Sequence, residues 1–103
     1  MKLLIIGDDF LITDTLEKIC TKISRFKNSI ICYYAQAAEV FNVHQPSHTI
    51  IVAECQKPKN KNCESNNLLN FLKKHKKENQ KIIKVDAPFD RFDRTKIEDF
   101  LQE

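Results

Sequence analysis

An unbroken run of four large apolar residues, Leu3-Leu4-Ile5-Ile6, leads directly into Gly7 and the acidic pair Asp8-Asp9. A short apolar run without alternation, closed by a glycine, is typical of a strand buried on both faces in the centre of a parallel sheet. The two carboxylates then follow the carboxyl end of this strand, where the loops of open α/β sheets form ligand-binding crevices. Adjacent carboxylates repel each other, and a divalent cation with oxygen ligands offsets that repulsion. The alternative is that Asp8 and Asp9 are turn and helix-cap residues.

Segments with the patterns of helices and strands alternate along the rest of the chain. Apolar residues spaced three and four apart predict a helix over 10–26, in which Thr13 faces solvent. Residues 30–34 are rich in strand-forming side chains, and residues 35–43 form a short helix with Ala38 facing inward. The later segments are strands at 49–53 and 81–85 and helices at 68–77 and 95–101. This alternation predicts right-handed βαβ units, a parallel sheet with helices on both faces, and a single domain over residues 1–103.

A third carboxylate, Glu54, follows the predicted strand at 49–53, as Asp8 and Asp9 follow the first strand. The carboxyl ends of parallel strands meet at one edge of the sheet, so the three side chains converge if the two strands are neighbours. Carboxylate oxygens are ligands that Mg²⁺ prefers. We therefore predict a magnesium-type acidic pocket formed by Asp8, Asp9 and Glu54, with a vestigial pocket as the alternative, and no other cofactor.

Positive charge is concentrated in one part of the chain. The formal net charge is +3, and residues 57–84 hold nine lysines against only Glu64 and Glu78. Such a run either contacts an acidic partner or forms a solvated helix face. The candidate partner-binding residues are Lys73, Lys74, Lys76, Lys77, Lys81 and Lys84. Nucleic-acid binding is disfavoured, because no aromatic residues are interleaved with these lysines and no helix-turn-helix or zinc signature occurs.

Several functional classes are excluded by what the sequence lacks. Gly7 is the only glycine, which rules out glycine-rich phosphate loops. The four cysteines lack zinc-ligand spacing, and none of the three histidines is spaced to activate Cys55, so we expect no enzymatic activity. No apolar run is long enough to cross a bilayer, and no signal-peptide pattern opens the chain. We expect a cytoplasmic protein with reduced thiols and no membrane association.

Four stretches of the chain resemble response-regulator receiver domains, the CheY-like family. Residues 1–9, Met-Lys-Leu-Leu-Ile-Ile-Gly-Asp-Asp, resemble the family's opening, and residues 50–58, Ile-Ile-Val-Ala-Glu-Cys-Gln-Lys-Pro, resemble its third strand and the following loop. Residues 37–39, Ala-Ala-Glu, are similar to the start of its second helix, and residues 88–90, Pro-Phe-Asp, to the end of its Lys-Pro-Phe motif. The resemblance covers nearly the whole chain and implies a flavodoxin-like three-layer α/β sandwich. It also implies that the acidic pair helps to hold Mg²⁺ and that a strand-end Asp accepts a phosphoryl group from a histidine kinase.

Three positions of the family pattern carry other residues in this chain. Glu54 stands at the phosphoacceptor position, and its extra methylene displaces the carboxylate by a distance that can slow in-line attack about 10²-fold. We therefore do not expect Glu54 to be phosphorylated, although its charge could imitate a phosphorylated Asp. Asp86 stands at the position of the family's switch Thr or Ser, and Ala87 at that of its Lys.

The chain is also shorter than the family pattern by one helix and one strand. We therefore expect a sheet of four strands, or of five if residues 87–92 form an irregular fifth segment. The exposed edge of the strand at 81–85 must be covered, charged or paired, and a homodimer could form through it.

These features predict an atypical receiver (pseudo-receiver) domain of a bacterial two-component-type signalling system. It would act with a protein partner as a phosphorylation-independent interaction module. Two alternatives remain open. One is a phosphorylatable receiver of unusual chemistry that uses Asp8, Asp9 or Asp86, and the other is a small basic nucleic-acid-binding α/β protein.

Overall fold

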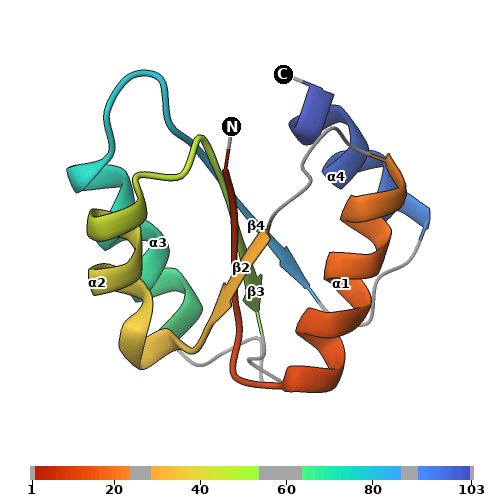
Figure 1. Ribbon diagram of the computed structural model, residues 1–103, viewed down its shortest axis with the longest axis horizontal. Helices are drawn as coiled ribbons and strands as arrows, with labels where there is room; N and C mark the ends of the chain where they lie inside the picture. The colour runs from red at the N-terminus through yellow and green to blue at the C-terminus, as the bar shows by residue number, and fades with distance from the viewer. Residues whose placement is uncertain (1, 24–28, 54–63, 87–90, 103) are drawn as a thin grey trace.

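The computed structural model describes residues 2–23, 29–53, 64–86 and 91–102, along which strands and helices alternate (Figure 1). In chain order the elements are β1 (Leu3–Ile6), α1 (Phe10–Ile23), β2 (Ser29–Cys32), α2 (Tyr34–His44), β3 (His48–Ala53), α3 (Glu64–His75), β4 (Lys81–Asp86) and α4 (Arg91–Gln102). The described part of the chain is therefore an α/β structure, as the alternating sequence patterns predicted.

Within the described residues, the strands form one parallel sheet in the order β2-β1-β3-β4. β1 lies between β2 and β3, with Leu3 opposite Ser29 on one side and opposite His48 on the other. Every residue of β1 is fully buried. This position explains the unbroken apolar run, because a strand that is covered on both faces has no solvent-facing side to carry polar residues.

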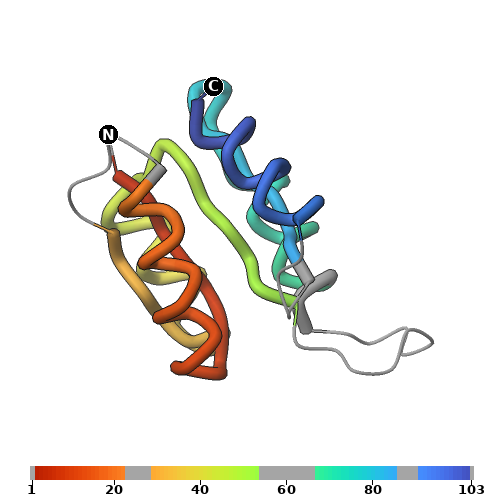
Figure 2. The backbone as a smooth tube through the Cα atoms, turned by 90° about the vertical axis from the view of Figure 1, so that its right-hand side faces the viewer, coloured from red at the N-terminus to blue at the C-terminus, as the bar shows by residue number. Residues whose placement is uncertain are grey.

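The helices form two layers, one on each face of the sheet. In Figure 1, α2 and α3 lie to the left of the sheet and α1 and α4 to its right, and Figure 2 looks onto the layer of α1 and α4. Alternate strand residues enter the two cores, so that Leu3 and Ile5 pack in the core under α1 and α4. Leu4 and Ile6 pack in the core under α2 and α3. The predicted coverage of both sheet faces is confirmed.

Helix α1 buries Leu16 and Cys20 against the sheet, as its apolar spacing predicted. The expectation that Thr13 faces solvent is wrong, because this side chain is fully buried. Its hydroxyl donates to the carbonyl oxygens of Asp9 and Phe10, at 3.3 and 3.1 Å. Burial of Thr13 therefore leaves its polar atom satisfied by the first turn of its own helix.

The second strand ends earlier than the sequence predicts. β2 stops at Cys32, so that Tyr33 is the N-cap of α2 and Tyr34 its first residue. The N–H of Gln36 donates to the carbonyl of Tyr33 at 3.0 Å, and this bond closes the first helical turn in place of strand pairing. Helix α2 then buries Ala37, and the expectation that Ala38 faces inward is wrong.

The last two helices begin earlier than predicted. α3 starts at Glu64 instead of near residue 68, and α4 starts at Arg91 instead of residue 95. Because Arg91 and Phe92 are helical, the alternative of an irregular fifth segment is wrong for these two residues, while residues 87–90 lie outside the described ranges. Asp93 in the first turn of α4 favours the earlier start through the helix dipole.

Candidate functional site

The acidic pair lies where the sequence predicted, beyond the carboxyl end of β1. The strand ends at Ile6, the N–H of Gly7 donates to the carbonyl of Cys32 in β2 at 3.1 Å, and Asp8 and Asp9 follow as exposed residues. This carboxyl edge of the sheet faces downward in Figure 1. β1 and β3 are neighbours, as the predicted acidic pocket requires, and β3 ends at Ala53. Glu54, the next residue, lies outside the described residues.

Asp9 is the cap of α1. Its Oδ1 accepts a hydrogen bond from the backbone N–H of Leu11 at 3.0 Å, and its carbonyl accepts one from the N–H of Thr13 at 3.0 Å. A carboxylate at this place satisfies an amide that has no partner within the helix and interacts favourably with the positive end of the helix dipole. The helix-cap alternative considered from the sequence is therefore correct for Asp9.

Asp8 supports the start of a different helix. Its Oδ1 accepts a hydrogen bond from the backbone N–H of Tyr34, the first residue of α2, at 3.0 Å. The negative charge of Asp8 also lies close to Cys32, and together with burial it raises the pKa of the Cys32 thiol to about 11, burial being the larger cause. The acidic pair therefore connects the end of β1 to the first turns of both α1 and α2.

Tyr34 joins the same edge to β3. Ile6 is opposite Ile51, so β3 continues for Val52 and Ala53 beyond the end of β1. The hydroxyl of Tyr34 donates to the carbonyl of Val52, and because β1 lies between β2 and β3, its side chain reaches past the end of β1. Sequence reasoning missed this role, because Tyr34 reads as part of an aromatic, strand-forming run.

Three large apolar side chains are exposed beside the acidic pair, and we call them the carboxyl-edge patch: Phe10, Leu11 and Tyr33. Their exposed fractions are 61%, 75% and 52%. Phe10 and Leu11 directly follow Asp9, and Tyr33 directly precedes the amide that Asp8 binds, so the hydrogen bonds of the acidic pair fix the backbone of all three. Exposed aromatic and aliphatic side chains that gather in one place are typical of protein-binding surfaces.

The metal-binding potential of the edge depends on carboxylates from several elements. Within the described ranges, no three His, Cys, Asp or Glu side chains are grouped so that they could hold a metal ion. Asp8 and Asp9 are two of the three predicted ligands. The predicted switch residue Asp86 ends β4 and pairs with Ala53 of β3, so its backbone belongs to the same carboxyl edge.

The predicted partner-binding lysines lie elsewhere. Four of them are exposed in or just after the last turn of α3: Lys73, Lys74, Lys76 and Lys77. Figure 1 places this end of α3 at the amino edge of the sheet, opposite to the acidic pair. Lys81 and Lys84 are half-buried on β4. The four lysines at the end of α3 and the acidic pair therefore form separate surfaces.

Comparisons of the chain with family models, curated proteins and solved structures found no match. None of the helices within the described ranges is both long enough and apolar enough to cross a membrane. Functional inference therefore depends on the residues of this chain and on their arrangement.

Proposed function

We propose that the chain is an atypical receiver-like domain of flavodoxin-like fold, which acts as a phosphorylation-independent protein-interaction module in two-component-type signalling. The parallel order β2-β1-β3-β4 supports this, because flavodoxin-like sheets have the order 2-1-3-4-5 and bind their ligands where β1 meets β3. The acidic pair after β1 and the sequence resemblance to receiver domains point to the same family. The sheet described here lacks a fifth strand among the residues that the structure describes.

One arrangement carries the proposed function. The Oδ1 atoms of Asp8 and Asp9 are each bound by a helix-start amide, at 3.0 Å in both cases, while the neighbouring carboxyl-edge patch is exposed. The carboxylates thus hold the edge in one conformation, and the apolar side chains beside them supply contact area for a partner. Aromatic side chains in such patches dominate the binding energy of many protein interfaces.

A magnesium ion is compatible with this function but is not required for it. Carboxylate oxygens of Asp8, Asp9 and Glu54 would hold the ion, and its charge would offset the repulsion between the neighbouring carboxylates. Because the helix amides already partly compensate the charge of Asp8 and Asp9, partner binding should not depend on Mg²⁺.

Cross-linking and affinity capture from a lysate of the source cells test this function. The wild-type chain is compared with the double variant Phe10→Ser, Leu11→Ser and with Val43→Ser, which changes an apolar side chain on α2 that is 66% exposed. We expect the double variant to lose its specific partners and Val43→Ser to keep them. Treatment with acetyl phosphate and Mg²⁺ should change neither the captured set nor the intact mass of the chain.

The opposite results would contradict the proposed function. Capture of the same partners by the double variant would show that these partners do not bind through the carboxyl-edge patch. Addition of a phosphoryl mass, or partners that appear only after acetyl phosphate, would instead indicate a phosphorylatable receiver.

A further inference from the structure

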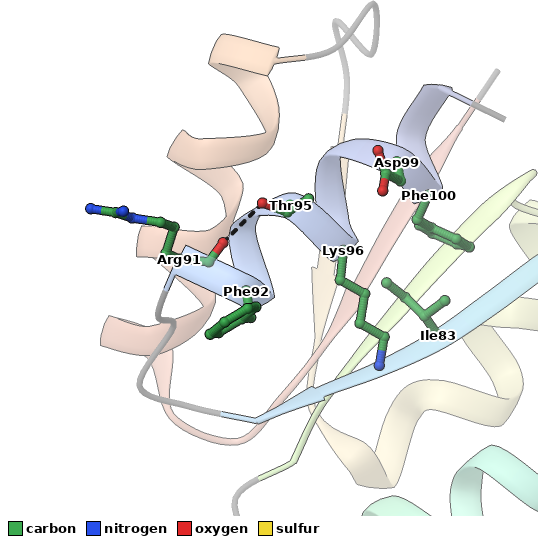
Figure 3. A pocket seen from close by; sticks show the side chains of 7 residues that line it. All are labelled: Ile83, Arg91, Phe92, Thr95, Lys96, Asp99 and Phe100. Atoms are coloured by element: carbon green, nitrogen blue, oxygen red, sulfur yellow. Dashed lines mark hydrogen bonds between the residues drawn. The ribbon is translucent and has the colours of Figure 1, made fainter.

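A groove of about 610 Å³ lies between the edge strand β4 and helix α4, and none of its lining residues belongs to the carboxyl-edge patch (Figure 3). Its lining residues are Ile83, Arg91, Phe92, Thr95, Lys96, Asp99 and Phe100. Phe92, Lys96 and Phe100 are spaced four residues apart, and Figure 3 shows all three on the side of α4 that faces β4. The groove thus has an aromatic residue toward each end, a lysine between them and the edge of a sheet beside it.

The backbone of β4 is oriented for pairing on its outer side. The N–H of Lys81 donates to the carbonyl of Ser47, at 2.9 Å, on the side of β3. Because backbone groups alternate in direction along a parallel strand, Ile82 and Lys84 direct their N–H and C=O groups away from β3. The carbonyl of Lys84 accepts a hydrogen bond from Nζ of Lys96 at 3.0 Å, which agrees with this orientation. The ammonium group of Lys96 therefore occupies the position that a backbone N–H of an added strand would take.

The charge around the groove indicates which strand would fit. Arg91 and Lys96 line it and are exposed, whereas Asp99 is its acidic lining residue. Basic groups therefore outnumber acidic ones among the lining side chains. Ile83 and Phe100 add apolar surface. A complementary segment is extended and carries both an apolar side chain and a carboxylate on the face that meets α4.

We propose that the outer edge of β4 and this groove bind an extended acidic segment of a partner protein by strand addition. A backbone N–H of the segment replaces Lys96 on the carbonyl of Lys84, and the released ammonium group pairs with a carboxylate of the segment. An apolar side chain of the segment packs between Ile83 and Phe100. This surface shares no lining residue with the carboxyl-edge patch, and its use does not depend on the function proposed for that patch.

A second copy of this chain fits the edge less well. Antiparallel pairing of two β4 strands would bring Lys84 and Lys96 of both chains to one shared edge. Like charges that face each other across paired strands are destabilising. An acidic segment instead gains from the charge of Lys96.

The test is an NMR titration of the full chain with two synthetic peptides of equal length. One peptide repeats Val-Thr-Glu-Thr, so that valine and glutamate lie on the same face of the added strand, and the other repeats Val-Thr-Lys-Thr. We expect the acidic peptide to shift the backbone amide signals of Ile82 and Lys84 and those of α4 from Phe92 to Phe100. The lysine peptide should shift none of them.

Two further measurements separate strand addition from simple charge attraction. Lys96→Glu should weaken binding of the acidic peptide at least about tenfold. The matched control Lys22→Glu, which reverses an exposed charge in the last turn of α1, should leave the binding constant unchanged. A version of the acidic peptide that is N-methylated on alternate residues cannot donate the backbone hydrogen bonds, and it should also bind about tenfold more weakly.

Each contrary result has a defined meaning. Equal binding of both peptides, no binding, or shifts confined to residues 8–11 would overturn strand addition at β4. Shifts of Ile82 and Lys84 that grow with protein concentration alone would show that a second copy occupies the edge. Stronger shifts with a single-stranded oligonucleotide would assign the groove to nucleic acid. Because Lys96→Glu leaves Phe10 and Leu11 unchanged, failure here is distinguishable from failure of the proposed function.

Discussion

The carboxylate of Asp8 accepts a hydrogen bond from the backbone N–H of Tyr34 at 3.0 Å, although 26 residues separate the two in the chain. This bond fastens the end of the central strand β1 to the start of α2. Its neighbour Asp9 caps α1 in the same way through the N–H of Leu11. The two acidic residues that resemble a family's metal ligands thus have a structural role that can be measured directly.

Replacement of Asp8 should destabilise the fold. Asp8→Ala leaves the Tyr34 amide without its acceptor, and loss of such a helix-start hydrogen bond costs about 1 kcal/mol. Asp8→Asn keeps an acceptor oxygen and should lose less. Urea unfolding measures both changes. Asp14→Ala is the control, because Asp14 pairs with Lys18 at the surface, at 3.2 Å, and exposed pairs contribute little. An Asp8→Ala variant as stable as Asp14→Ala would contradict this role.

The hydroxyl of Tyr34 should contribute to stability independently of the aromatic ring. Tyr34→Phe removes the donor to the Val52 carbonyl and should lower the free energy of unfolding by about 1 kcal/mol. Tyr33→Phe, at a neighbouring ring that is 52% exposed, should have no measurable effect. Thermal and urea unfolding of the two variants provide the comparison. Equal stability of the two variants would mean that hydration of the Tyr34 hydroxyl in the unfolded chain offsets its hydrogen bond to Val52 in the native protein.

Two buried threonines should respond in opposite directions to the same substitution. The Oγ1 of Thr49 in β3 is buried and has no hydrogen-bond partner in the part of the chain that the structure describes. Thr49→Val should therefore stabilise the protein by up to about 1 kcal/mol, because a methyl group replaces an unsatisfied hydroxyl. Thr13→Val removes the hydrogen bond that the Thr13 hydroxyl shares between two backbone carbonyls and should lower the stability. A loss of stability in Thr49→Val would show that its hydroxyl has a partner.

Stability should fall as the solution becomes alkaline. Burial, helped by the charge of Glu17, raises the pKa of the Cys20 thiol from 9.0 to about 12. Burial and Asp8 raise the pKa of Cys32 from 9.0 to about 11. Above pH 9.0 the unfolded chain loses these protons while the native protein keeps them, so the native state loses stability with rising pH, by at most about 1.4 kcal/mol per pH unit for each thiol.

Urea unfolding between about pH 8 and pH 10.5 measures this slope. The variants Cys20→Ala and Cys32→Ala should each show a flatter decline than the wild-type protein, because one of the two thiols no longer titrates. A variant with the same slope as the wild-type protein would show that the replaced thiol has no raised pKa.

The sequence predicts the elements of this fold that depend on local pattern. The bounds of β1 follow from its apolar run, and the inward stripe of α1 from its three- and four-residue spacing, which places Leu16 and Cys20 in the core. The all-parallel sheet follows from the alternation of strands and helices. These features depend on neighbouring residues in the chain, which a sequence displays directly.

The features that the sequence does not predict depend on contacts between distant residues or on the exact ends of elements. The bond from Asp8 to Tyr34 requires β1 and β2 to pair in one register, and no local signal encodes it. The amphipathic pattern does not predict that Phe92 is helical, because this aromatic residue is 84% exposed and interrupts the pattern. The pattern places Thr13 on the solvent-exposed face because threonine is polar, whereas hydrogen bonds to the first turn of its own helix allow its hydroxyl to be buried.

The side chain of Tyr34 limits the space that a small ligand could occupy at the carboxyl edge. In open α/β sheets ligands bind in the crevice where the strand order reverses, which is between β1 and β3 in this sheet, and the Tyr34 hydroxyl is bound to Val52 across that place. A ligand that needs this space competes with a side chain of the protein itself. Its apparent affinity is then the intrinsic affinity multiplied by the fraction of molecules in which Tyr34 has moved away, so the crevice favours ligands that bind tightly enough to displace this side chain.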